Sequence, residues 1–341
     1  MTESKRLKLA LVGCGNIARA HWRGIRYVAT DIDVTAVVDA DAGRAEAMAE
    51  RTGAAAFTSL GDAFTHGDFD AVDLMLPHDL HEEYAGQVFA AGKHLVLEKP
   101  IAPDVAAAGR IFEAAERADT VFMVAEQAQY WPDVIRAREL IDAGEIGEVI
   151  TARACFYDPL SVDPEDPVPW RFRLKRAGGG ISIDGGAHWI RPLRMLLGEI
   201  DAAIAVTGRH IEAMEGESFA HALFCFQSGV TATFDALLHA SPVAPTEDFR
   251  VTGTAGEIVI EHGREGRLLL FNATHAEGTE VMQGFPGKVD SYGEELKDFA
   301  SAVLHGTELA ARPEKALGEL CTALAMYRSA QSGHWENVWD D

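Results

Sequence analysis

The sequence predicts an α/β plus α+β chain of two domains, with a parallel sheet in residues 1–126 and a largely antiparallel sheet in residues 127–341. Three observations lead to this fold class. The chain has 341 residues, more than the roughly 100 to 200 that one domain commonly holds. Short apolar runs alternate with segments of helical period up to Ala125, the pattern of βαβ units. Beyond Trp131 the apolar residues alternate and β-branched residues become frequent, which indicates antiparallel strands.

The first domain is expected to repeat a strand followed by a helix. Each expected strand is a short apolar run, and the runs cover residues 9–12, 34–38, 71–76, 94–97 and 121–124, with 54–57 a weaker one. The helices between them are expected over residues 17–27, 42–51, 81–91 and 105–118. Gly53 and Gly92 follow two of these helices, and glycine is typical of helix ends.

The second domain is expected to begin with a helix over residues 132–143 and to continue mainly in strands. The expected strands cover residues 149–156, 203–207, 220–226, 231–237 and 249–252. Three further helices are expected over residues 188–197, 293–304 and 313–332. We find no internal repeat that would indicate a solenoid.

Composition narrows the possible partners. A hydrophobic content of 48% without long low-complexity stretches is typical of a folded globular protein. The 53 acidic and 30 basic residues give a formal net charge of −23, which repels phosphate backbones and anionic lipid surfaces. Nucleic acid and membranes are therefore not expected as partners.

The cysteines favour a reducing compartment. Cys14, Cys155, Cys225 and Cys321 lie far apart, and none has the two-residue spacing of a zinc or redox pair. No cleavable leader is recognisable and no run of about 18 apolar residues occurs. We therefore expect the protein in the cytoplasm.

A glycine-rich stretch follows the first expected strand. Residues 13–18 read Gly-Cys-Gly-Asn-Ile-Ala and fit the G-x-G-x-x-G/A fingerprint of dinucleotide-binding Rossmann domains. Gly13 permits the tight turn, Gly15 lets the backbone approach a pyrophosphate, and Ala18 lets the helix pack closely on the sheet. Asn16 and Ile17 begin the helix whose N-terminus attracts the phosphates.

Asp39 follows the second expected strand, where a carboxylate can accept hydrogen bonds from the ribose hydroxyls. It would repel a 2′-phosphate, and Ala40 beside it offers no cation, so NAD is expected rather than NADP, with Arg44 as the reservation. The alternative is that Gly13 and Gly15 form an ordinary turn and that Asp39 caps the next helix.

Two further motifs carry side chains suited to chemistry. Glu98-Lys99-Pro100 stands at the end of the fifth expected strand, and strand ends of a parallel sheet face the ligand crevice. Far downstream, the glycine-rich residues 178–188 contain Asp184 and His188, which lie four apart and hence on one face if the segment is helical. We expect these two side chains to share one substrate.

These motifs together resemble the Gfo/Idh/MocA family, whose members pair a Rossmann domain with an open-sheet substrate domain and oxidise or reduce sugars and cyclitols. The resemblance covers nearly the whole chain. It rests on Pro77 and His81 in a P-x-x-x-H stretch, on Glu98-Lys99-Pro100, and on the D-x-x-x-H of Asp184 and His188. Residues 140–149 (LIDAGEIGEV) and the turn at 251–256 (VTGTAG) also match.

The resemblance implies that Lys99 holds the substrate oxygen, that His188 exchanges its proton, and that Asp184 holds a neighbouring hydroxyl. Histidine suits proton transfer because its unperturbed pKa lies near neutrality, and lysine stabilises a developing alkoxide. The alternative is a surface lysine and a histidine satisfied in the core. The residues expected to bind the cofactor are Gly13, Gly15, Asn16, Ile17, Asp39, Pro77, His81, Glu98 and Lys99.

Arginines surround the expected catalytic histidine in the sequence. Where many relatives carry an aspartate three residues after it, this chain has Arg191, and Pro192 is expected to bend the helix. We expect Arg171, Arg173 and Arg191 to bind an acidic group of the substrate, because guanidinium groups bind carboxylates in a fork. The alternative is that they pair with nearby acids, as arginines commonly do in an acidic chain.

The function expected from these residues is hydride transfer between NAD and a hydroxyl or keto carbon of a sugar, cyclitol or sugar acid. One alternative is a glycosidase of the same family that uses NAD for transient oxidation and elimination. Another is a regulator that senses NAD without chemistry, which has no physical need for Lys99, Asp184 and His188 together.

Other classes fit the sequence less well. His78, His81 and His94 are not spaced as a zinc set, so no metal is expected. No G-x-S-x-G sequence is present for a hydrolase nucleophile. An exposed open sheet favours a symmetric partner, so we expect a homodimer or homotetramer.

Overall fold

The computed structural model describes residues 5–159, 169–239, 241, 247–261, 266–283 and 287–340. The chain forms two compact units. The first joins Met1–Gln127 to Lys288–Ala316, and the second joins Ala128–Gly287 to Leu317–Asp341. The first boundary adjoins the expected one after residue 126, but Lys288–Ala316 belongs to the first unit although the sequence analysis assigned it to the second.

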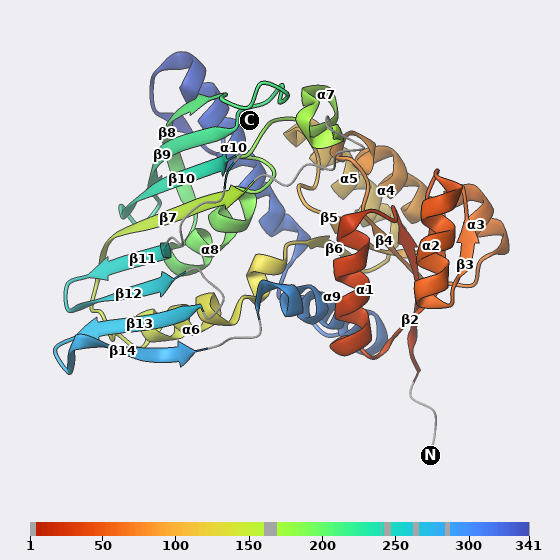
Figure 1. The fold of residues 1–341 in the computed structure, drawn as a ribbon, viewed down its shortest axis with the longest axis horizontal. Helices are drawn as coiled ribbons and strands as arrows, with labels where there is room; N and C mark the ends of the chain where they lie inside the picture. The colour runs from red at the N-terminus through yellow and green to blue at the C-terminus, as the bar shows by residue number, and fades with distance from the viewer. Residues whose placement is uncertain are drawn as a thin grey trace. The chain divides into compact units, whose positions relative to one another are not determined.

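The N-terminal unit contains a six-stranded sheet whose paired strands all run parallel, as predicted (Figure 1). The strand order is β3-β2-β1-β4-β5-β6. The direction of winding therefore reverses between β1 and β4, and ligands of such sheets bind at the carboxyl ends of the strands beside this point. The strands are β1 (Leu7–Val12), β2 (Ile32–Val38), β3 (Ala55–Phe57), β4 (Ala71–Leu74), β5 (His94–Glu98) and β6 (Phe122–Ala125).

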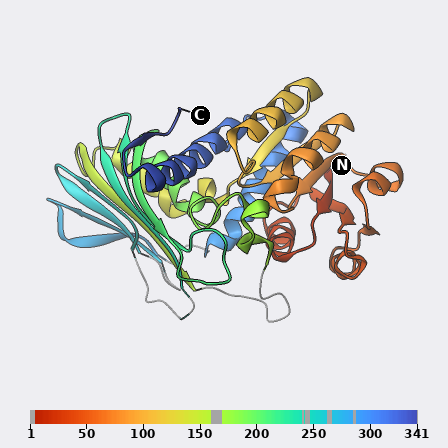
Figure 2. The same cartoon turned by 90° about the horizontal axis from the view of Figure 1, so that it is seen from above.

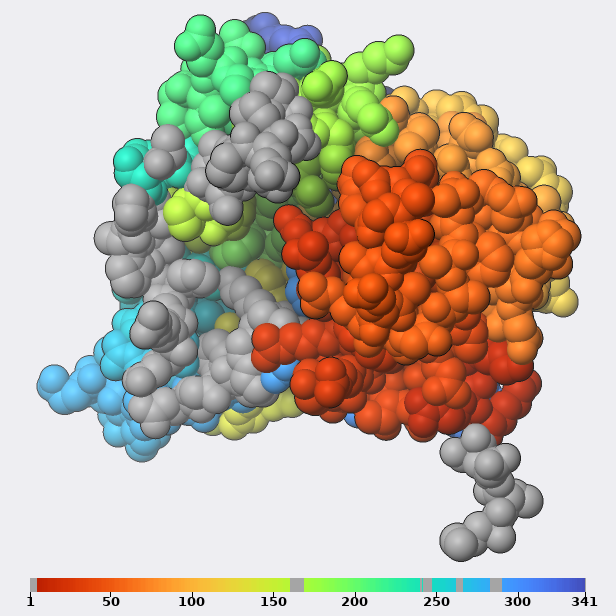
Figure 3. All heavy atoms as spheres, turned by 45° about the vertical axis from the view of Figure 1, so that its right-hand side comes forward, coloured from red at the N-terminus to blue at the C-terminus, as the bar shows by residue number. Residues whose placement is uncertain are grey.

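Helices connect these strands and pack on the sheet. They are α1 (Asn16–Tyr27), α2 (Ala42–Thr52), α3 (Leu60–His66), α4 (His81–Ala90) and α5 (Val105–Ala118), with α9 (Gly287–His305) returning from later in the chain. Figure 3 shows the atoms of this part of the chain, drawn red to orange, packed closely together. The core lies between sheet and helices, where Leu9, Leu11 and Leu95 are fully buried.

The C-terminal unit contains a nine-stranded sheet in the order β14-β13-β12-β11-β7-β10-β9-β8-β15. Every neighbouring pair is antiparallel except β7 and β10, which run parallel, so the predicted largely antiparallel sheet is confirmed. The strands are β7 (Val149–Pro159), β8 (Ile200–Gly208), β9 (Phe219–Phe226), β10 (Thr231–His239), β11 (Glu247–Gly253), β12 (Gly256–Glu261), β13 (Arg267–Asn272), β14 (His275–Gln283) and β15 (Glu336–Asn337).

Helices of this unit lie against one face of the sheet (Figure 2). They are α6 (Pro132–Asp142), α8 (Ala187–Leu197) and most of α10 (Ala316–Ser332), while the short α7 (Leu174–Ala177) precedes the glycine run. The strands alternate accordingly: Ala232 and Phe234 are fully buried, whereas Thr233 between them is exposed. Among the described helices, none is long and apolar enough to cross a bilayer.

Candidate active site

The glycine loop after β1 has the geometry that its sequence predicts. Gly13 has a φ of +93°, and a Cβ atom on it would lie 2.3 Å from the carbonyl oxygen of Met75. A Cβ on Gly15 would meet nothing within 4 Å, so the space beside this residue is open. Gly15 precedes α1, and no side chain of the described residues caps that helix. The first N–H groups of α1 are therefore left uncapped by the described side chains, as expected of a helix N-terminus that binds phosphate.

Asp39 lies against this loop. Its two carboxylate oxygens accept hydrogen bonds from the backbone N–H groups of Cys14 and Asp41, each at 2.9 Å. The cap of α2 is Asp41, which accepts from the N–H of Arg44 at 3.0 Å. The alternative that Asp39 caps this helix is therefore wrong. A carboxylate offers about four acceptor sites, so Asp39 can still accept from ribose hydroxyls.

A shallow pocket adjoins this loop between α1 and α2. It is lined by Cys14, Arg19, Asp41, Arg44 and Arg51, among others. Burial, followed by the charge of Asp39, raises the pKa of the Cys14 thiol to about 11. The thiol is therefore neutral, and the three guanidinium groups supply the positive charge of the pocket.

The loops that follow β4 and β5 are tied together by His81. Its ring is fully buried, with Nδ1 3.0 Å from the carbonyl oxygen of Pro100 and Nε2 2.9 Å from that of Leu76. Burial lowers the pKa of this histidine. His81 thus joins the loop of Pro77 to the loop of Lys99, so its contacts with the described residues support both loops.

Lys99 is the first residue after β5 and is partly buried. Its backbone N–H donates to Oε2 of Glu98 at 3.0 Å, and the Lys99–Pro100 peptide bond is cis. Glu98 itself is only 7% exposed. The structure thus fixes the backbone of Lys99 at the carboxyl edge of the parallel sheet, the edge where ligands bind in this architecture.

In the C-terminal unit the glycine run is packed so closely that side chains do not fit. A Cβ on Gly180 would lie 2.0 Å from the carbonyl oxygen of Glu217, and one on Gly185 would lie 2.5 Å from the ring of Phe156. The carboxylate of Glu217 accepts from the N–H groups of Gly180 and Ser182 at 2.9 and 2.8 Å. The hydroxyl of Tyr327 donates to the same carboxylate at 2.9 Å. The sequence analysis did not identify Glu217 or Tyr327, because each contacts the loop from a distant part of the chain.

This loop carries Asp184 and His188. Asp184 lies in the turns that precede α8, and His188 lies in the first turn of that helix; both side chains are partly exposed. Arg171 donates from Nε to Oδ2 of Asp184 at 3.0 Å and lies over the ring of Trp170 at 4.5 Å. The structure therefore brings Arg171 to the predicted catalytic aspartate. Arg173 is exposed at the start of α7.

Arg191 has a different environment. It is 2% exposed, and its guanidinium binds both carboxylate oxygens of Glu319 at 2.6 and 2.8 Å and Oε1 of Gln129 at 3.2 Å. Arg194 pairs with the same glutamate. For Arg191 the geometry favours the alternative of pairing with a nearby acid over contact with a substrate anion. Helix α8 continues through Pro192 to Leu197.

The residues that the structure describes contain no group of three or more histidine, cysteine, aspartate or glutamate side chains arranged to hold a metal ion.

Family comparisons cover both units. A family model described as "Oxidoreductase family, NAD-binding Rossmann fold" matches residues 7–126. A second, described as "GFO/IDH/MocA C-terminal domain", matches residues 134–259. Solved structures agree: an NAD-binding oxidoreductase from Klebsiella pneumoniae is 26% identical with a TM-score of 0.85, covering 98% of this chain and 100% of that one. An oxidoreductase from Thermotoga maritima is 28% identical with a TM-score of 0.85, covering 98% of both chains.

Curated relatives agree with this assignment. The 1,5-anhydro-D-fructose reductase of Ensifer adhaerens is 30% identical over 332 residues, which is 95% of this chain and 96% of that protein. Levoglucosan dehydrogenase of Pseudarthrobacter phenanthrenivorans is 28% identical over 253 residues, which is 67% of this chain and 65% of that protein. The chain therefore belongs to the Gfo/Idh/MocA family of NAD-dependent oxidoreductases.

Proposed function

We propose that this oxidoreductase acts on a sugar, cyclitol or sugar acid, with Lys99, Asp184 and His188 as its catalytic residues. The observation that carries the proposal is the closely packed loop that presents Asp184 and His188, since a loop without chemistry has no need of so fixed a conformation. Relatives named for levoglucosan, 1,5-anhydro-D-fructose and inositol support the substrate class.

Bound NAD supplies the nicotinamide that accepts or donates the hydride. The residues that would hold it are the glycine loop, through Gly13, Gly15 and the N-terminus of α1, and Asp39 at the ribose. Pro77, His81 and Glu98 support the loops beside it.

Each catalytic side chain has a separate role at the substrate. The ammonium of Lys99 donates to the reacting oxygen and stabilises negative charge as it develops there. The imidazole of His188 takes the hydroxyl proton in oxidation and returns it in reduction. Asp184 accepts from a neighbouring hydroxyl, and Arg171 holds the orientation of Asp184 through their ion pair.

The environment of Arg171 supports the proposal that the substrate carries an acidic group. Arg171 donates to Asp184 through Nε, and its side chain is about half exposed, so its terminal nitrogens can donate to a carboxylate. Arg173 is exposed in the same segment. We therefore include sugar acids in the proposed substrate class.

The experiment that tests the function is incubation with neutral sugars, cyclitols, sugar acids and glycosides, each with NAD and with NADP. Reduced nicotinamide is followed by absorbance and released aglycone by chromatography. Reduced nicotinamide in step with product supports the dehydrogenase, whereas aglycone without net reduction supports the glycosidase. Binding of NAD without turnover of any compound would support a sensor. Asp39 favours NAD, and faster turnover with NADP would instead implicate Arg19, Arg44 and Arg51.

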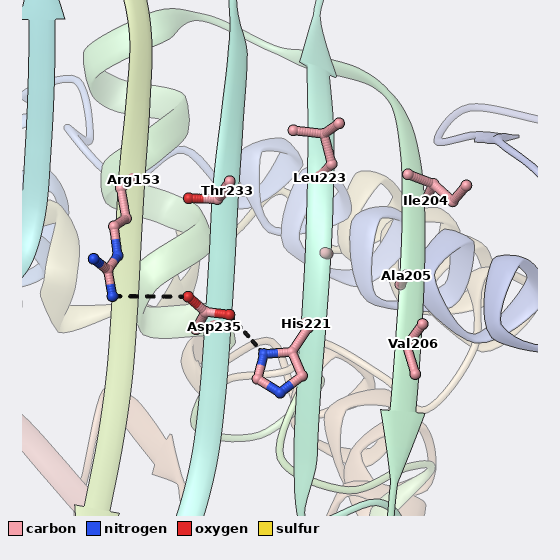
Figure 4. A pocket seen from close by; sticks show the side chains of 9 residues that line it. Arg153, Ile204, Ala205, Val206, His221, Leu223, Thr233 and Asp235 are labelled. Atoms are coloured by element: carbon pink, nitrogen blue, oxygen red, sulfur yellow. Dashed lines mark hydrogen bonds and ion pairs between the residues drawn. The ribbon is translucent and has the colours of Figure 1, made fainter.

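We also propose that the chain forms a homodimer or homotetramer through the helix-free face of its nine-stranded sheet. Figure 4 shows a pocket on this face, with the helices behind the strands. Asp235 lies between His221, at 2.6 Å, and Arg153, at 4.0 Å. Beside them Val206 is 65% exposed and Leu223 is 36% exposed. An apolar strip next to charged groups is typical of a subunit interface.

A cytoplasmic location is part of the same proposal. All four cysteines are free thiols, and Cys14, Cys155 and Cys321 are buried. Free thiols persist in a reducing compartment, which supports this location. Detection of the protein in a cell fraction other than the cytosol would contradict it.

A further inference from the structure

A charged histidine side chain is enclosed in the N-terminal unit. His21, in α1, has no exposed surface. Its Nδ1 lies 2.8 Å from Oδ2 of Asp73 in β4, and its Nε2 lies 3.0 Å from Oε1 of Glu98 in β5. Ionised carboxylates only accept hydrogen bonds, so with both acids ionised both ring nitrogens carry a proton. Burial raises the pKa of Asp73, while the charge and hydrogen bond of His21 oppose this rise. The geometry therefore indicates an imidazolium between two carboxylates.

The surroundings of His21 favour this charge state. Glu295, 1% exposed, also interacts with His21, but burial raises the pKa of its carboxyl well above the usual value, so it keeps its proton and adds no charge. The ring of Tyr292 lies 5.4 Å from the imidazole. Burial alone would lower the pKa of His21, but the charge and hydrogen bond of Asp73, followed by those of Glu98, raise it well above its usual value. Neutral histidine would leave buried carboxylates without a positive partner, which is strongly unfavourable.

The imidazolium is connected to the proposed active site through one side chain. Glu98 uses Oε1 for His21 and Oε2 for the backbone N–H of Lys99. A continuous series of hydrogen bonds therefore runs from Asp73 through His21 and Glu98 to the backbone of Lys99. Because Glu98 ends β5 and Lys99 follows it, this carboxylate contributes, together with the pairing of Glu98 with Ala125, to holding the backbone where the chain leaves the sheet.

We infer that His21 is a positioning residue, which fixes Glu98 and thereby holds the backbone of Lys99 in the conformation that catalysis requires. The inference rests on the proposed function in one respect, that Lys99 is catalytic. Stability alone does not account for the arrangement, since buried ion pairs are often no more stabilising than apolar residues of similar volume. Misplacement of a catalytic group by about 1 Å can reduce the rate about 100-fold, so control of this backbone matters for the reaction.

The test is a double-mutant cycle between His21 and Lys99. His21→Gln has no positive charge and carries its donors on one nitrogen, so it cannot reproduce the bonds that the two ring nitrogens make to the two carboxylates. We expect it to lower kcat by about 10- to 100-fold. The Kd for NAD and the KM for substrate should change by less than about threefold, because no substrate contact is lost. In a Lys99→Met background the same substitution should have little further effect on residual turnover.

The matched control is Asp73→Asn, which removes a carboxylate from the other side of the same ring. It leaves the bonds from His21 to Glu98 and from Glu98 to Lys99 in place, so kcat should stay within about threefold of the unmutated value even if the melting temperature falls. An equal loss of kcat in Asp73→Asn and His21→Gln, or an equal loss in both Lys99 backgrounds, would overturn the inference. Near-normal turnover of Lys99→Met alone would instead contradict the proposed function.

A second measurement does not depend on folding of the variants. In the unmutated protein labelled with nitrogen-15 at histidine, both ring N–H protons of His21 should be visible far downfield and persist at pH 8. The absence of an Nε2–H signal at neutral pH would show that His21 does not donate to Glu98 and would overturn the inference.

Discussion

At the scale of single residues, the proposed proton transfer depends on His188. Replacing it by alanine removes the only group assigned to move the hydroxyl proton, and general acid–base catalysis commonly contributes about two to four orders of magnitude. We expect His188→Ala to lower kcat by that amount. The glycine loop and Asp39 are untouched, so the Kd for NAD, measured by fluorescence titration, should stay unchanged. Turnover within a few-fold of normal would show that another group moves the proton.

Glu295 makes stability depend on pH. Burial above all raises the pKa of this carboxyl well above the usual 4.5, so the folded protein keeps the proton that the unfolded chain releases. The folded state then binds more protons, and the free energy of unfolding falls as pH rises above about 4.5. The raised pKa of His21 likewise makes the free energy of unfolding fall as pH rises above the ordinary histidine pKa of about 6.5.

Glu295→Gln should remove the contribution of this carboxyl. Between about pH 5 and pH 6.5 the free energy of unfolding of the variant should fall less steeply, by up to about 1.4 kcal/mol per pH unit. Urea unfolding at several pH values measures this slope. The neighbouring Glu294 is exposed, so Glu294→Gln is the control and should keep the slope of the unmutated protein. Parallel curves for Glu295→Gln and the unmutated protein would contradict the expectation.

Residue-scale prediction from the sequence succeeded where chemistry is local. The positive φ of Gly13 and the position of Asp39 beside the glycine loop follow from short motifs. The ion pair of Arg191 could not be predicted from a short motif, because its partner Glu319 lies on another helix far along the chain. His21 was missed for the same reason, since its two carboxylates come from different strands.

At the scale of elements, the loop of residues 178–186 is held by the carboxylate of Glu217 and the phenol of Tyr327 in α10. Burial, followed by the charge of Glu217, raises the pKa of Tyr327 well above its usual value, so the phenol stays neutral and donates to the carboxylate. The hydroxyl oxygen also accepts from the N–H of Gly180 at 3.2 Å. The conformation before Asp184 therefore depends on both side chains.

Glu217→Gln should disturb this loop, because an amide N–H₂ would replace one of two acceptors that face N–H and O–H donors. We expect kcat to fall at least about tenfold and the free energy of unfolding to fall by about 1 to 3 kcal/mol. Tyr327→Phe removes one donor to Glu217 and one acceptor for the N–H of Gly180, which keeps its bond to Glu217. This variant should cost about 1 kcal/mol and lower kcat less than Glu217→Gln does. Steady-state kinetics and urea unfolding measure both. Normal kcat in Glu217→Gln would mean that the loop needs no such support.

The existence of most elements was predictable. The elements that were not predicted include α3 and the three consecutive strands β12, β13 and β14. Helix α3 has seven residues and is stabilised by the cap of Ser59 rather than by a long apolar stripe. The edge strand β14 is largely polar, so its sequence lacks a strong apolar alternation. The parallel pairing of β7 with β10 joins segments that are far apart in the chain, and local patterns carry no information on pairing.

At the scale of the whole molecule, the proposed oligomer gives a direct test. A glutamate at Val206 would place a charge in the apolar strip of the helix-free sheet face, and a buried unpaired charge opposes association. We expect Val206→Glu to lower the mass found by light scattering to that of the monomer. Ile135 on α6 is 42% exposed on the helical side, so Ile135→Glu should leave the mass unchanged. An unaltered oligomer in Val206→Glu would exclude this face as the interface.

The division into units was only partly predictable. The helix near residues 293–304 was expected and is α9, but sequence order does not tell on which sheet a helix packs. Helix α9 packs on α1 in the N-terminal unit. The two helices are so close that a Cβ on Gly24 would lie 2.6 Å from the backbone nitrogen of Gly293. The two glycines permit this close approach and place α9 in the N-terminal unit.

The packing of α9 in the N-terminal unit has a consequence for folding during synthesis on the ribosome. The first 127 residues contain all six strands of the nucleotide-binding sheet, yet the unit also needs Lys288–Ala316. A nascent chain that ends before α9 lacks the helix that supplies Glu295 and Tyr292 beside His21. Domains that are contiguous in sequence can fold in the order of their synthesis. Here the unit that is translated first can be completed only after residues 128–287 of the second unit have been synthesised, because α9 follows them in the sequence.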